Sequence, residues 1–192
     1  MKTTLCLPNG YREILSVDLQ KDKKKALLIN ALAIVIGVVL VLLGCTRVPL
    51  MVLFDLEMGL LTFGFRFVVL ALGSTAYIVL HELVHGIFMK YFSGDKPHYG
   101  FTGMYAYAGS VAYFNKRNYI TIALAPVVVW GIVLAALCEI VSPLWFWVVY
   151  IIQITNLSGA AGDFYVTWKF RTLPKDILVQ DIGVSMKVFS VE

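Results

Sequence analysis

Two histidines and a glutamate interrupt an otherwise apolar run between Ala76 and Gly86. Residues four apart lie on the same face of an α-helix, so His81 and His85 can both offer a ring nitrogen to one metal ion. Glu82 projects about 100° round the helix from His81, where its carboxylate can reach a water molecule bound to that metal. Because unpaired ionisable groups are costly inside an apolar helix, this spacing predicts a zinc site with Glu82 as the catalytic base.

The composition indicates that this motif belongs to an integral membrane protein. Of the 192 residues, 59% are hydrophobic and 15% are charged, and the mean hydropathy is +0.80. The net charge of +4 comes from basic residues that stand beside apolar segments, and no nucleic-acid-binding motif accompanies them. We therefore predict that the partner of this protein is a lipid bilayer, whose anionic headgroups attract the basic residues, and that the protein binds no nucleic acid.

Four apolar segments are long enough to cross a bilayer as helices, since each crossing takes roughly 20 residues. We predict an all-α protein of the membrane with spans at about 26–44, 65–91, 119–141 and 144–168. A polar segment, 1–25, precedes this membrane domain of 26–168, and a short tail, 169–192, follows it. Residues 98–118 alternate aromatic and small side chains, which predicts a short hairpin or a re-entrant loop between the second and third spans.

The distribution of basic residues predicts the orientation of these spans. Lysine and arginine are enriched on the cytoplasmic side of membrane proteins. With both termini in the cytoplasm, 14 of the 16 lysine and arginine residues fall on that side, and only Arg47 and Arg66 do not. We therefore predict a multi-pass protein of the cell membrane with both ends cytoplasmic.

A catalytic zinc ion normally takes three protein ligands, so the motif histidines need one more at their own depth. Counted from the cytoplasmic ends of their spans, His85 and Asp163 both lie roughly 9 Å into the membrane, at 1.5 Å per residue. Asp163 is therefore the favoured third ligand, and His98 is the alternative if a re-entrant loop carries it back. Asn156 lies two turns before Asp163, where its amide either hydrogen-bonds a substrate or joins two helices.

These motifs resemble those of the membrane zincin peptidases, a bacterial family distantly similar to the site-2 intramembrane metalloproteases. The resemblance rests on three stretches: Leu7-Pro8-Asn9-Gly10-Tyr11 before a lysine cluster, His81-Glu82-Leu83-Val84-His85-Gly86, and Asn156 followed by Gly162-Asp163. It implies zinc ligands at His81, His85 and Asp163 and a base at Glu82. In site-2 proteases the aspartate is usually followed by glycine, whereas Phe164 follows it here.

The sequence thus predicts a zinc-dependent peptidase that hydrolyses a peptide bond in or beside the membrane, near its cytoplasmic face. Its expected substrate is a membrane protein or peptide. The alternatives are a zinc-binding sensor or transporter without catalysis, and a scaffold that has lost it. Glu82 argues against a sensor or transporter, because such a protein needs metal ligands but no base beside them.

Overall fold

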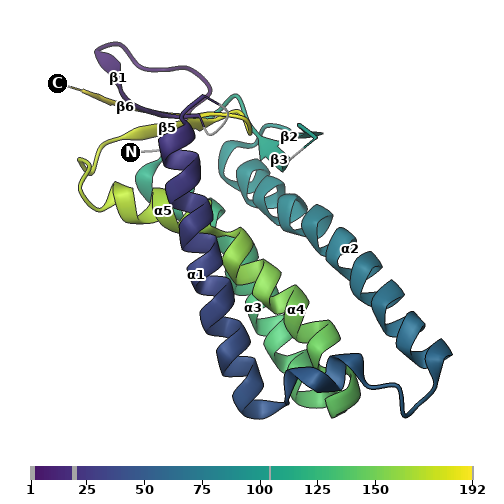
Figure 1. Cartoon of the computed structure of the whole chain (residues 1–192). Helices are drawn as coiled ribbons and strands as arrows, with labels where there is room; N and C mark the ends of the chain where they lie inside the picture. The colour runs from purple at the N-terminus through teal and green to yellow at the C-terminus, as the bar shows by residue number, and fades with distance from the viewer. Residues whose placement is uncertain (1–2, 19–20, 104, 192) are drawn as a thin grey trace. The chain divides into compact units, whose positions relative to one another are not determined.

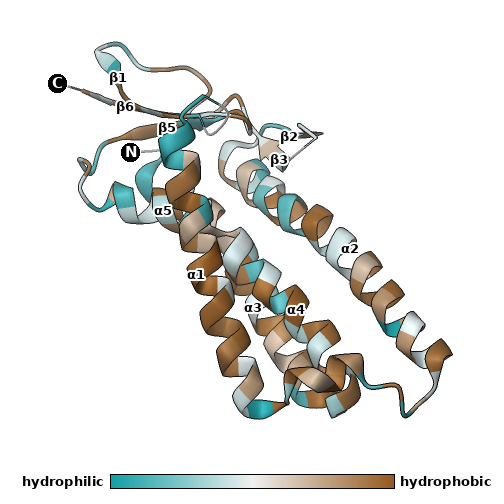
Figure 2. Ribbon diagram, viewed as in Figure 1, coloured by the Kyte–Doolittle hydropathy of each residue, from teal (hydrophilic) through white to brown (hydrophobic). Residues whose placement is uncertain are grey.

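The computed structural model describes residues 3–18, 21–103 and 105–191 (Figure 1). Four helical segments are long and apolar enough to cross a membrane, judged by length and composition. They are α1 (Lys23–Arg47), α2 (Leu60–Ser93), α3 (Lys116–Ile140) and the consecutive pair α4 (Pro143–Gly159) and α5 (Ala161–Phe170). Apolar residues cover most of α1 (Figure 2), and many of them, such as Leu27, Ile34 and Leu42, are exposed.

The chain divides into two compact units, which we describe separately. The first, here called the site unit, comprises Met1–Ile29, Leu80–Pro126 and Gly162–Glu192. The second, here called the helical unit, comprises Asn30–Val79 and Val127–Ala161.

The site unit contains a four-stranded antiparallel sheet with the strand order β1-β6-β5-β4. Its strands are β1 (Tyr11–Val17), β4 (Tyr113–Asn115), β5 (Leu178–Asp181) and β6 (Met186–Val191). The sheet therefore joins the two ends of the chain, with Val17 opposite Met186 and Tyr11 opposite Val191. One apolar core holds the sheet against the helices, and its fully buried members include Phe114, Ile122, Phe170 and Val188.

A separate two-stranded sheet precedes β4 in the site unit. Strands β2 (His98–Phe101) and β3 (Ala106–Gly109) pair in antiparallel register, with Tyr99 opposite Ala108. Gly103 in the connecting turn has a φ of +89°, a conformation that favours glycine. The first part of the stretch 98–118 thus forms a hairpin, whereas its last residues form β4 and the beginning of α3.

The prediction of an all-α fold is wrong, because six strands in two sheets accompany the helices in the described residues. The segments predicted as a polar lead-in and a tail supply β1, β5 and β6. Each of these strands is seven residues or shorter, and β1 pairs with a strand at the opposite end of the chain. Such pairing depends on contacts that no local sequence pattern reveals.

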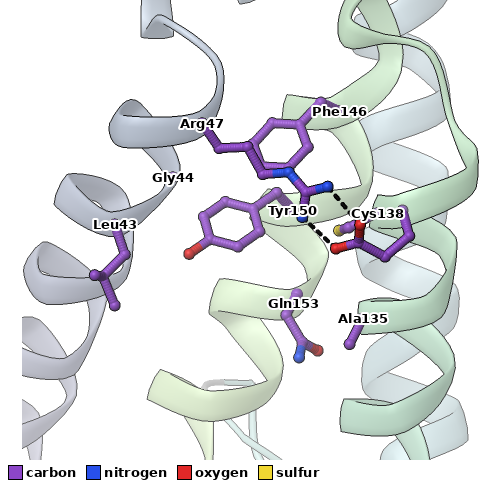
Figure 3. Close-up of a pocket in the computed structure, with 9 residues that line it drawn as sticks. Leu43, Gly44, Arg47, Ala135, Cys138, Phe146, Tyr150 and Gln153 are labelled. Atoms are coloured by element: carbon purple, nitrogen blue, oxygen red, sulfur yellow. Dashed lines mark hydrogen bonds and ion pairs between the residues drawn. The ribbon is translucent and has the colours of Figure 1, made fainter.

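The helical unit is held together by close helix packing and by polar contacts. A Cβ atom at Gly44 would collide with the rings of Tyr150 and Trp147, so glycine allows α1 to lie against α4. Arg47 on α1 forms a two-pronged ion pair with Glu139 on α3, and both residues line a pocket together with Cys138 and Tyr150 (Figure 3). Between α1 and α2, the chain forms a 3-10 helix, η1 (Leu50–Phe54).

Candidate metal centre

His81 and His85 lie one turn apart on α2 and point their rings toward the same space. Their Nε2 atoms are 3.2 Å apart, and the ring planes meet at 76°. Both residues are partly buried. The helical spacing alone accounts for this arrangement, since residues i and i+4 stack along one face.

Asp163, in the first turn of α5, completes a group of three potential metal ligands. One of its carboxylate oxygens lies 3.8 Å from Nε2 of His81, and the other lies 3.9 Å from Nε2 of His85. The donor atoms of the group all lie within 4.8 Å of one another. Two ligands bound tetrahedrally to zinc at its usual bond lengths are about 3.3 Å apart. The spacing and chemistry of these two imidazoles and one carboxylate therefore fit a zinc ion.

His98 lies elsewhere in the site unit and is not a member of this group of described residues. It begins β2, it is exposed, and its Nε2 atom is 3.3 Å from the carbonyl oxygen of Ile182. The hairpin strand directs it toward the end of β5 rather than toward the motif histidines. The structure thus brings Asp163, and not His98, together with His81 and His85.

The second ring nitrogen of His85 is also engaged. Nδ1 lies 2.9 Å from the backbone carbonyl oxygen of Ile122 on α3. A carbonyl oxygen can only accept a hydrogen bond, so Nδ1 is the protonated nitrogen and Nε2 retains its lone pair. Metal-bound histidines almost always make such a bond with their other nitrogen, because it fixes the ring and its tautomer.

Glu82 stands beside these ligands and faces the β2–β3 hairpin. The backbone N–H of Ala108 on β3 donates a hydrogen bond to its carboxylate, and the charges of His85 and Asp163 act on it. Tyr99 on β2 lies near Glu82 as well. Burial, and to a smaller extent the charge of Glu82, raise the pKa of the Tyr99 hydroxyl. The hairpin therefore both orients and covers the carboxylate.

A further carboxylate, Asp181 at the end of β5, approaches the site and was missed by the sequence analysis. It accepts hydrogen bonds from the hydroxyl of Tyr119 and, over 2.8 Å, from the backbone N–H of Gly183. Burial raises its pKa, while the charges of His85 and Asp163 act on it in opposite directions. No motif marks this residue, because it reaches the site only through the pairing of β5 with β4 and β6.

Asn156 belongs to the helical unit and is fully buried there. Its side-chain oxygen accepts a hydrogen bond of 2.9 Å from the hydroxyl of Tyr77, and its nitrogen donates one of 3.2 Å to the carbonyl of Val127. These contacts connect α4 with α2 and α3. Of the two roles predicted for Asn156, the structure gives the residue the contacts of the interhelical one, and its role toward a substrate stays a prediction.

Comparison with protein families gives a match to this chain. A family model described as "Putative zincin peptidase" matches residues 74–178, which is more than half of the chain and includes the motif histidines, Glu82 and Asp163. Comparisons with curated proteins and with solved structures found no match.

Proposed function

The chain belongs to the family described as "Putative zincin peptidase", and from this premise we propose that it is a membrane-embedded, zinc-dependent peptidase. We propose that it cleaves a membrane protein or peptide near the cytoplasmic face. The observation that carries this proposal is the convergence of Asp163 with His81 and His85 from distant parts of the sequence, with Glu82 beside them. A bound metal alone needs no such carboxylate, whereas hydrolysis does.

His81, His85 and Asp163 would hold the zinc through Nε2, Nε2 and a carboxylate oxygen. Zinc in such a site polarises a carbonyl group and lowers the pKa of a water molecule to near neutrality. Glu82 acts as the general base: it accepts a proton from the attacking water and later donates it to the nitrogen of the leaving amine. The N–H of Ala108 holds the carboxylate in position for both transfers.

The β2–β3 hairpin is the proposed guide for the substrate. A membrane helix hides its carbonyl groups in its own hydrogen bonds, so the segment to be cleaved must be extended first. An extended segment can add to the edge of a sheet through backbone hydrogen bonds. The hairpin lies beside Glu82, to which Ala108 donates a hydrogen bond. The alternative role of its exposed aromatic residues, Tyr99 and Phe101, is that of an interfacial aromatic belt.

Glu82→Gln in the purified protein tests the proposal. The substitution keeps the size and the hydrogen-bonding oxygen of the side chain but removes the base. We expect zinc to remain near one equivalent per chain and peptide cleavage to fall by at least about 100-fold, the usual contribution of a general base. His81→Ala and Asp163→Ala, in contrast, should lose the zinc as well.

These measurements also separate the proposal from a zinc sensor or transporter. A sensor or transporter would keep its function in the Glu82→Gln variant, because only its ligands matter. Zinc at one equivalent with no cleavage in the wild type would contradict the peptidase, and it would fit a sensor, a transporter or a scaffold that has lost catalysis. Absence of zinc from the wild type would contradict both the peptidase and the zinc sensor or transporter.

A further inference from the structure

A proline lies inside helix α3, in the part of this helix that belongs to the site unit. Pro126 is buried in the middle of α3, which continues for fourteen residues to Ile140. Proline is the least favourable residue in a helix interior, because it has no N–H and its ring pushes against the carbonyl group four residues earlier. At this position that carbonyl belongs to Ile122.

The carbonyl that Pro126 leaves without its helical partner is the one that binds His85. In a regular helix the N–H of residue 126 would donate to the oxygen of residue 122. Ile122 is almost completely buried, at 1% exposure, so solvent cannot replace that donor. Nδ1 of His85 lies 2.9 Å from this oxygen and takes the place of the missing N–H.

We propose that Pro126 is a positioning residue for the metal centre: by withholding a backbone donor, it keeps the Ile122 carbonyl available to His85. The hydrogen bond fixes His85 as the Nδ1–H tautomer and directs the lone pair of Nε2 toward His81 and Asp163. Any other residue at 126 supplies an N–H that competes for the same oxygen. The consequence for zinc rests on the proposed function, whereas the tautomer of His85 does not.

The test is Pro126→Ala in the full-length protein, first without metal. The chain has three histidines, so nitrogen-15 labelling of histidine gives few signals, and a His98→Gln background reduces them to the two motif residues. At a pH where the rings are neutral, long-range proton–nitrogen spectra distinguish the two tautomers. In the wild type we expect the Nδ1–H form for His85, and in Pro126→Ala a shift toward the Nε2–H form.

Two further readouts accompany the spectra. Hydrogen exchange at the backbone amide that Pro126→Ala introduces should show protection, because that N–H recovers Ile122 as its acceptor. Competition with a chelator should show zinc affinity reduced by about 10- to 100-fold, as is typical when the hydrogen-bond partner of a ligand is lost. Pro143→Ala is the matched control: Pro143 occupies the first turn of α4, where a missing N–H has no helical partner, and the tautomer of His85 and the zinc affinity should stay at wild-type values.

The outcomes are separable. An Nε2–H tautomer of His85 in the metal-free wild type overturns the inference even if the Pro126→Ala variant does not fold. An unchanged tautomer together with unchanged zinc affinity in a folded Pro126→Ala protein overturns it as well. A tautomer of His85 that shifts in Pro126→Ala, together with a wild type that binds no zinc, supports the positioning of His85 by Pro126 and contradicts the proposed peptidase.

Discussion

Gly86, directly after the second histidine, sets how closely the hairpin can approach Glu82. A Cβ atom there would collide with the hydroxyl and ring of Tyr99 on β2. We expect Gly86→Ala to displace the hairpin from α2, to weaken the bond from Ala108 to Glu82, and to lower kcat on the order of 10- to 100-fold, as small misplacements of catalytic groups do. Zinc content should be unchanged. Peptide cleavage and metal analysis of the same preparation measure both effects.

Tyr99→Ala provides the cross-check on this prediction. Removing the ring relieves the collision, so the double variant should be more active than additivity of the two single variants allows. Gly64→Ala is the control on the same helix, since a Cβ atom there meets open space, and it should keep full activity. Additive losses in the double variant would contradict the collision.

Asp181 makes the stability of the protein depend on pH in a defined direction. Burial raises its pKa above the ordinary value of 3.8, so the native state holds this proton more tightly than the unfolded state. The free energy of unfolding of the metal-free protein should therefore fall as the pH rises from about 3.8 through the raised pKa. Asp181→Asn cannot ionise and should lack this part of the dependence. Unfolding measured across that pH range for both proteins gives the difference, and parallel curves would contradict it.

The residues of the candidate site differ in how far the sequence could reveal them. His81, Glu82 and His85 are neighbours on one helix turn, so their spacing alone relates them in space. Asp163 is 78 positions beyond His85. The sequence relates the two only when the residues of each span are counted from its cytoplasmic end, which places both at the same depth. Asp181 carries no such signal, because its position follows from the register of β5 against β4, in which Gln180 faces Tyr113.

At the scale of elements, a buried arginine connects η1 to the neighbouring helices of the helical unit. Arg66 on α2 is completely buried and donates hydrogen bonds to the backbone carbonyls of Val52, Asp55 and Leu144. Charged donors contribute about 1.5–3 kcal/mol per hydrogen bond, so we expect Arg66→Ala to lower the free energy of unfolding by about 3 kcal/mol or more. Denaturation in detergent measures this loss.

Arg47→Ala is the comparison for this prediction. Arg47 is paired with Glu139 but exposed, and exposed ion pairs contribute little to stability. Its removal should leave the unfolding transition almost unchanged, and zinc content should be normal in both variants because the ligands belong to the site unit. If Arg66→Ala lowers the free energy of unfolding no more than Arg47→Ala does, the carbonyl contacts of Arg66 do not stabilise η1.

The elements themselves were predictable where a physical pattern is long and local. The four apolar segments are each about as long as the hydrocarbon core of a bilayer is thick, or longer, and each corresponds to a helical segment that is long enough to span one. The strands are short, and their partners are remote: β6 pairs with β1 and β5, and β5 pairs with β4. In β6 the buried residues are Met186 and Val188–Ser190, so strict alternation is absent as well. The alternation typical of a half-buried strand is therefore not available as a signal in this segment.

For the molecule as a whole, the pairing of β1 with β6 constrains how the chain enters the membrane. These strands lie near opposite ends of the sequence, and a sheet with open edges is not stable in lipid. We therefore expect residues 11–17 and 186–191 to lie in the same aqueous compartment, which requires an even number of crossings between them. The four candidate spans meet this requirement, and the excess of basic residues favours the cytoplasm as that compartment.

The native cysteines can test this topology. Cys6 precedes α1 and Cys45 lies near its end, and both are exposed, whereas Cys138 is buried. We expect a membrane-impermeant maleimide added to intact cells to label Cys45 in a Cys6→Ser, Cys138→Ser protein. The same reagent should label Cys6, in a Cys45→Ser, Cys138→Ser protein, only after the cells are opened. The reverse pattern would move the candidate metal centre to the outer face, and equal labelling of both from outside would mean that α1 does not cross the membrane.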